Sequence, residues 1–74
     1  MIIQGSALSI GCEGTEVKQW QAFLNWAGFN CGTPDGDFGM KTASGTREFQ
    51  KATGLTPDAV VGSKTIAKAK TFER

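Results

Sequence analysis

Hydrophobic residues recur at helical spacing over residues 15–28. They fall on one side of an α-helix: Val17, Trp20, Leu24 and Ala27, with Phe23 widening that side. Thr15 is in position to cap the first turn, where Glu16 suits the helix dipole, and Gly28 is placed to end the helix. This segment is the first predicted helix.

Residues 40–53 and 63–72 have the same periodicity and are predicted as two further helices. The positions expected to face inward are Ala43, Thr46, Phe49 and Thr53 in the first, and Ile66, Ala69 and Phe72 in the second. Gly45 lies inside the segment 40–53 and should cost about 1 kcal/mol relative to alanine. Residues 1–14 are predicted as an extended arm, because Leu8 and Ile10 alternate with polar neighbours.

The loops before the last two helices have the same pattern. Residues 33–42 read TPDGDFGMKT, and residues 56–65 read TPDAVVGSKT. Proline and aspartate in these positions favour tight turns whose backbone N–H groups bind the carboxylate. The sequence therefore predicts an all-α fold, a small three-helix bundle with an extended N-terminal arm and two similar loop–helix repeats.

Length and charge narrow the possible functions. Seventy-four residues make a single domain over 1–74, with a core over 8–72 and residues 1–7 as an arm or an added start. A net charge of +1 argues against nucleic acid as a partner. No apolar run reaches the ~18–20 residues of a membrane span. The first twelve residues lack the pattern of a signal peptide.

The residue types that usually carry catalysis or metals are scarce. The chain has no histidine, and its two cysteines, Cys12 and Cys31, flank a predicted helix about 20 Å long. A disulfide needs Cα atoms within about 7 Å, so free thiols are favoured over a pair. The loop at Asp35 lacks the later ligands of a calcium site. We expect no cofactor, no metal and no catalysis in so small a chain.

Several residues of the repeated loops have two interpretations. Asp35 and Asp58 either satisfy backbone donors of their turns or face a groove and accept bonds from a ligand. Gln21 and Gln50 each follow an aromatic residue and are expected to bond loop backbone. The threonines at positions 42 and 65 are expected to cap their helices.

The best candidates for ligand contact are residues that the two copies do not share. Asp37 and Phe38 in the first loop stand where the second loop has Val60 and Val61. Aromatic side chains near polar loops suit sugar faces or peptide methyl groups, and cations suit peptide carboxylates. The complete set of ligand candidates is Trp26, Phe29, Asp35, Asp37, Phe38, Lys41 and Arg47.

An ordered string of residues gives the chain a family resemblance. It comprises Leu8, Gly11, Gly14, Val17, Gln21, Leu24, Gly28, Asp35-Gly36, Phe38-Gly39, Thr42, Phe49-Gln50, Gly54-Leu55, Asp58, Gly62 and Thr65. Over about residues 8–67 the chain resembles the three-helix peptidoglycan-binding domain found beside the catalytic domains of bacterial and phage cell-wall hydrolases. Trp20, Thr46 and Ala59 depart from the pattern, where the family has leucine, an aliphatic residue and glycine. Ala59 predicts a second turn that differs from the first.

The resemblance implies a non-catalytic module that binds peptidoglycan, by stem peptide, glycan or both, and targets a linked or partner hydrolase to the wall. It implies action at the bacterial cell wall, in a phage-released protein or in part of a longer secreted one. The alternative is a protein-interaction or pro-domain module that packs on a partner enzyme. That alternative predicts an exposed apolar patch around Trp26 and Phe29.

Overall fold

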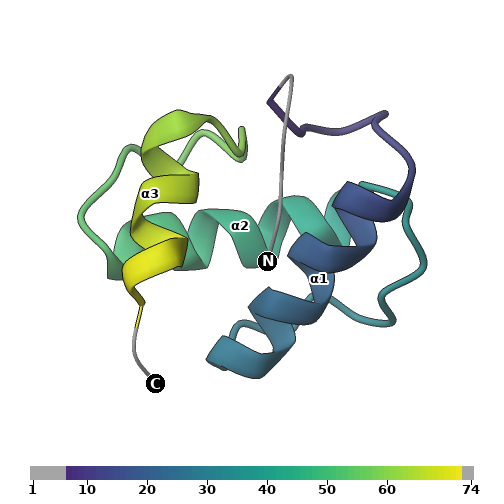
Figure 1. Cartoon of the computed structure of the whole chain (residues 1–74), viewed down its shortest axis with the longest axis horizontal. Helices are drawn as coiled ribbons and strands as arrows, with labels where there is room; N and C mark the ends of the chain where they lie inside the picture. Colours follow the sequence, from purple (N-terminus) through teal and green to yellow (C-terminus); the bar gives the residue numbers. More distant parts are fainter. Residues whose placement is uncertain (1–6, 73–74) are drawn as a thin grey trace.

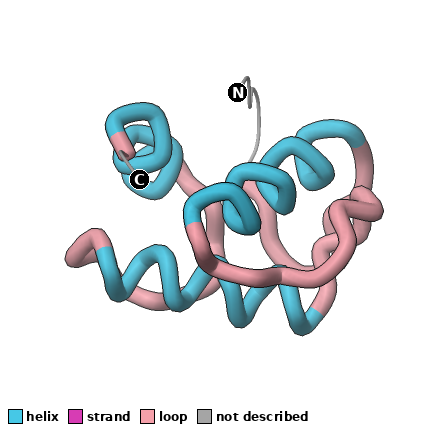
Figure 2. Tube along the Cα trace, turned by 90° about the horizontal axis from the view of Figure 1, so that it is seen from below, coloured by secondary structure: helices cyan, strands magenta, loops and turns pink. Residues whose placement is uncertain are grey.

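The computed structural model describes residues 7–72, which form three helices: α1 (Thr15–Ala27), α2 (Met40–Ala52) and α3 (Ser63–Thr71). α1 crosses one end of α2 and α3 crosses the other (Figure 1). Figure 2 shows that α1 and α3 lie on the same side of α2. The predicted all-α, three-helix fold is confirmed, and the first six residues of the predicted arm lie outside the described residues.

The helix ends lie close to the predicted ones, with one different cap. α1 begins at Thr15, but its N-cap is Gly14, so the predicted capping role of Thr15 is wrong. Gly14 is the last non-helical residue, with φ 126°, and its N–H is bound to the carbonyl of Gly36 at 2.9 Å. Its carbonyl already accepts the N–H of Lys18, so the helix begins one residue before a Thr15 cap would allow. Gly28 ends α1 in the left-handed conformation, as predicted. α2 ends one residue early, with Thr53 as its cap.

The core consists of the predicted helix positions. α1 contributes Val17, Trp20 and Leu24, and α2 contributes Ala43, Thr46 and Phe49, all fully buried. α3 contributes the buried Ala69, while Ile66 and Phe72 pack against the core and keep part of their surface exposed. Edge-on ring contacts hold this core together, because Phe49 meets the rings of Trp20, Phe23 and Phe29 at centroid distances of 5.5, 5.4 and 5.7 Å.

Two departures from the family pattern compensate each other. The indole Nε1 of Trp20 donates a hydrogen bond to Thr46 Oγ1 at 2.9 Å. The same hydroxyl donates to the carbonyl of Thr42 at 2.7 Å. A buried indole N–H needs an acceptor, and an aliphatic residue at position 46 would supply none. The tryptophan and the threonine therefore form one polar contact inside the core.

Gly45 is explained by the contact between the loop after α1 and the middle of α2. A Cβ atom at this position would lie 3.2 Å from the Cβ of Cys31 and 3.2 Å from the carbonyl oxygen of Phe29. The loop after α1 therefore passes directly over this turn of α2. The helix accepts the lower helix propensity of glycine because a larger residue would push this loop away.

The arm joins the two repeated loops. Leu8 exchanges backbone hydrogen bonds with Val61 of the second loop at 3.2 and 2.8 Å. Four residues later the arm pairs with the first loop, where the N–H of Phe38 donates to the carbonyl of Cys12 at 2.9 Å. Between these contacts the arm turns at Ile10 and Gly11, closed by a bond from the N–H of Cys12 to the carbonyl of Ser9, so the prediction of a continuously extended arm is wrong here. Both loops are fixed to this one short segment, and this positions the surface described next.

Candidate functional site

A buried glutamine organises the first loop. Gln21 is 1% exposed, and its amide Nε2 donates to Asp35 Oδ1 at 3.1 Å, to the carbonyl of Asp37 at 2.9 Å and to Thr42 Oγ1 at 2.9 Å. Its Oε1 accepts the N–H of Gly36 at 2.9 Å. One side chain from α1 therefore ties the loop to the first turn of α2. The prediction that this glutamine bonds loop backbone is confirmed.

The second loop has the same network one helix later. Gln50 donates to Asp58 Oδ1 at 3.0 Å, to the carbonyl of Val60 at 3.0 Å and to Thr65 Oγ1 at 3.2 Å. Its Oε1 accepts the N–H of Ala59 at 3.0 Å. Each bond has its counterpart in the first loop, so the sequence repeat is also a structural repeat.

Asp35 and Asp58 hold their turns in shape. In each case Oδ1 accepts a backbone N–H two residues on, from Asp37 and from Val60, at 2.9 Å. These backbone bonds, aided by the glutamine amides, hold the pKa of both carboxyl groups below the ordinary value of 3.8. Both residues are nevertheless exposed, and the bonds from the loop backbone and from the glutamines all go to Oδ1. The interpretation that these aspartates satisfy backbone donors of their turns is confirmed.

The expectation that Ala59 makes the second turn different is wrong. Ala59 has φ 63°, in the left-handed region, and Gly36 at the equivalent position has φ 84°. The bonds from Gln50 and Asp58 hold the loop in the same shape, although a left-handed conformation costs a residue with a Cβ about 1–2 kcal/mol. The network therefore outweighs the preference of a single residue.

Thr42 and Thr65 do not cap their helices. The N-caps of α2 and α3 are Gly39 and Gly62, and neither helix has a side-chain cap. Both threonine hydroxyls instead accept a bond from the buried glutamine amide, which has no water to satisfy it. The first backbone N–H groups of α2 are left facing the loop, where the helix dipole favours a negative group.

The first loop borders an open groove of about 410 Å³ at the start of α2. Its lining includes the exposed side chains Asp35, Asp37 and Lys41, and the strongly exposed Met40. The side chain of Asp37 has no part in the shared network, because that network uses only its backbone groups. The groove therefore combines charges of both signs with an apolar side chain, as ligand sites commonly do.

The other predicted ligand residues lie away from this groove. Phe38 is 3% exposed and belongs to the core, so the expectation that it contacts ligand is wrong. Trp26 is 49% exposed, as predicted, but its ring packs on Phe23 and Phe72 at the opposite end of α1. Phe29 is half-buried against Phe49 and Phe72.

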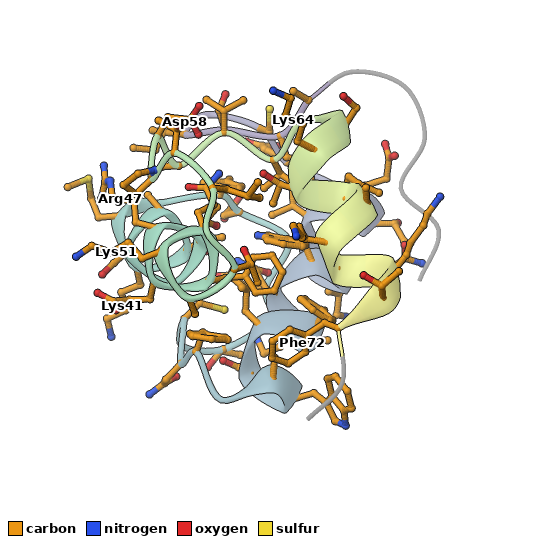
Figure 3. The ribbon with its side chains drawn as sticks, turned by 90° about the vertical axis from the view of Figure 1, so that its left-hand side faces the viewer. Lys41, Arg47, Lys51, Asp58, Lys64 and Phe72 are labelled. Carbon is orange, nitrogen blue, oxygen red and sulfur yellow. The ribbon has the colours of Figure 1, made fainter. Side chains whose placement is uncertain are left out.

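Arg47 is exposed on the outer side of α2, which neither α1 nor α3 covers (Figure 3). It does not line the groove. Sequence reasoning missed Met40 and Cys31, which do line it. Met40 could have been predicted as a groove residue, because it directly follows the loop glycine, begins the helix and lies off its buried face.

Both cysteines are free thiols. Cys31 is 3% exposed behind the groove, where its Sγ donates to the carbonyl of Gln21 at 3.4 Å. Burial raises the pKa of this thiol, which keeps it protonated and unreactive. In the described part of the chain no three metal-ligand side chains gather. None of the described helices is long and apolar enough to cross a membrane.

The chain matches a family model described as "Putative peptidoglycan binding domain" over residues 13–68. The chain belongs to this family. The family resemblance drawn from the ordered string of residues over about 8–67 is thereby confirmed. Peptidoglycan-binding domains of this family occur in cell-wall hydrolases, so the interpretation as a protein-interaction or pro-domain module is not favoured.

Individual relatives agree with this assignment. The spore cortex-lytic enzyme of Bacillus cereus is 36% identical over 67 residues, which cover 86% of this chain and 26% of that enzyme. The crystal structure of the SleB N-terminal domain has a TM-score of 0.90 at 32% identity, covering 93% of this chain and 94% of that one. The Burkholderia AP3 phage endolysin has a TM-score of 0.85 at 29% identity, over 93% of this chain and 26% of that one. The chain thus spans about a quarter of two of these proteins.

Proposed function

We propose that the chain is a non-catalytic module that binds peptidoglycan through the stem peptide, with the groove of the first loop as its contact site. The supporting observation is the lining of that groove by two carboxylates and an ammonium, from Asp35, Asp37 and Lys41. These groups match the amides, amines and carboxylates of a peptide. The exposed ring that would suit a sugar face, Trp26, lies elsewhere.

The proposal of a non-catalytic role has support in the same groove. Hydrolysis of an amide or glycosidic bond needs a group that releases a proton to the leaving atom. The lowered pKa of Asp35 keeps it ionised at neutral pH, and its Oδ1 is held by two hydrogen bonds. The groove is also open to solvent, which weakens any electrostatic help to a transition state.

The partner we propose is a hydrolase, linked to this domain or bound beside it. Two relatives, the cortex-lytic enzyme and the endolysin, extend well beyond the matched region. A module that stays on the wall raises the effective concentration of its enzyme, so even weak affinity is useful. The proposed setting is the bacterial wall, reached by phage release or as part of a longer secreted protein.

The test is retention on purified peptidoglycan sacculi. We expect the wild-type domain to sediment with sacculi and Lys41→Glu to lose a large part of that retention. Lys51→Glu is the matched control, because it makes the same charge change on the exposed side of α2, outside the groove. Equal losses in the two variants would contradict a site in this groove.

A second variant separates peptide from glycan binding. Trp26→Ala removes the exposed ring without touching the groove. Retention on sacculi should stay unchanged if the stem peptide is the ligand. A loss confined to Trp26→Ala would move the contact to the aromatic end of α1 and to the glycan. No retention of the wild-type domain would refute the proposed function as a whole.

A further inference from the structure

A second groove lies at the second loop. It measures about 260 Å³ and is lined by Asp58, Val60, Gly62, Ser63, Lys64 and Thr65. Six residues that line the first groove occupy the equivalent positions of the repeat: Asp35, Asp37, Gly39, Met40, Lys41 and Thr42. The two repeats therefore present the same kind of hollow, and each hollow has the loop aspartate and the lysine of the following helix in its lining.

The two grooves keep the same charged pair. Asp58 is exposed, and its hydrogen bonds to the amide of Gln50 and the N–H of Val60 both use Oδ1. Lys64 is exposed in the first turn of α3 and lines the same groove. Figure 3 shows both residues at one edge of the molecule. The ammonium of Lys64 can bind the carboxylate of a peptide, and the carboxylate of Asp58 can accept its N–H.

The grooves differ at one exposed position. Where the first has the carboxylate of Asp37, the second has Val60, which is 39% exposed. Three charged side chains at the first groove are reduced to two at the second, and an apolar surface replaces the third. The second groove therefore disfavours an extra ammonium and favours a methyl-sized side chain next to the peptide carboxylate.

We propose that the second groove is a second ligand subsite, which takes the carboxyl-terminal end of a stem peptide with a small apolar side chain. This rests on the proposed function, because it assumes that the first groove binds the same polymer. The arm bridges to both loops within the six residues from Leu8 to Glu13, so one short segment connects the two subsites. A polymer with repeated stem peptides engages both at once, and the two contacts reinforce each other.

An NMR titration of the domain locates the subsites. The probe is N-acetyl-D-alanyl-D-alanine, which has one carboxylate, methyl side chains and no ammonium. We expect saturable shifts of the backbone amides of 58–65, and weaker shifts at 35–42, where Asp37 repels the carboxylate. Shifts confined to 35–42, or no saturable shifts, would overturn the second subsite.

Retention on sacculi tests whether both subsites act together. Lys64→Glu should lower retention by at least about tenfold, since one of two linked contacts is lost. The matched control is Lys68→Glu, one turn further along α3, exposed and outside the groove. Equal retention of the two variants would overturn the proposal while the first groove and the proposed function stand. A wild-type domain that fails to sediment with sacculi would overturn both.

The fold of the variants is checked separately. Lys64 and Lys68 are exposed, and none of the hydrogen bonds of the Gln50 network uses them, so both variants should keep the circular dichroism spectrum and the unfolding midpoint of the wild type. Val60→Asp supplies a second, independent variant. It installs the first groove's carboxylate in the second, so it should reduce the shifts at 58–65 to about the size of those at 35–42 and leave the latter unchanged. Undiminished shifts at 58–65 would count against the assigned role of Val60.

Discussion

The loops 33–42 and 56–65 have the same hydrogen bonds and different surfaces. Each is held by a buried glutamine that binds an aspartate, a carbonyl, a threonine and a backbone N–H. The side chains that make these bonds are common to both copies. Of the residues that differ, Gly36, Asp37, Ala59 and Val60 use only their backbone in the network, Phe38 and Val61 fill the core, and Met40 and Ser63 are exposed at the start of their helices. The comparison separates the groups that shape the loop from the groups that a ligand meets.

Removing the glutamines should have the largest effect. Gln21→Leu leaves the N–H of Gly36 and the carbonyl of Asp37 without their buried partner, and it should lower the free energy of unfolding by about 2–4 kcal/mol. Gln50→Leu should cost somewhat less, because fewer arm residues depend on the second loop. Urea denaturation of both variants measures the difference. A loss below 1 kcal/mol in either would mean that the loops are held mainly by other contacts.

Substitutions at the left-handed position, Gly36 in the first loop and Ala59 in the second, should change stability in opposite directions. Gly36→Ala adds a Cβ 3.2 Å from the carbonyl oxygen of Gly14 and forces φ 84° on alanine, so it should destabilise by about 1–3 kcal/mol. Ala59→Gly relieves the same strain but frees the unfolded chain, leaving a gain of about 0–1 kcal/mol. Thermal unfolding of the two variants tests this. A destabilised Ala59→Gly would show that the second turn carries no strain.

The aromatic residue before each glutamine gives a third contrast. Trp20 needs Thr46 as an acceptor, while Phe49 has no polar atom to satisfy. Thr46→Val should therefore cost about 1–2 kcal/mol in the wild type and much less in a Trp20→Phe background. A double-mutant cycle measures this coupling by denaturation. Equal costs in both backgrounds would exclude the coupling.

Acid should weaken both loops. The pKa of Asp35 and of Asp58 is lowered by the backbone bonds to residues 37 and 60, so each group stabilises the fold above its ordinary pKa of 3.8. That stabilisation is lost as pH falls from 3.8 through the folded value. The melting temperature should be flat near neutral pH and fall below about pH 4. Asp35→Asn and Asp58→Asn should each flatten that fall, and an unchanged acid profile would contradict the assignment.

Replacing Asp37 by valine, the residue at the equivalent position of the second loop, should leave the free energy of unfolding nearly unchanged. Asp37→Val should alter the free energy of unfolding by less than about 0.5 kcal/mol, because its side chain makes no bond in the network. Retention on sacculi should nevertheless fall about two- to fivefold, the effect of one exposed charge. Ser44→Ala on the exposed side of α2 is the control. Unchanged retention would remove Asp37 from the contact surface.

Much of the fold followed from local signals. The spacing of Val17, Trp20 and Leu24 placed the first helix, and the position of Gly28 ended it. The repeated loop and the string of family residues identified the domain, because turn chemistry is local and strong. The candidate groove was found only in part. Asp35, Asp37 and Lys41 line one groove, as expected. Phe38, which follows Asp37 directly in the chain, is instead buried in the core.

What the sequence alone determined is the set of elements and the family, since helix periodicity and turn residues act between neighbours in the chain. Tertiary structure decided which side of each loop meets solvent. It paired Trp20 with Thr46, required glycine at position 45, and held Ala59 in a conformation that alanine by itself avoids. These outcomes depend on contacts between residues far apart in sequence. A single buried amide with four partners can override the preference of any one residue it touches.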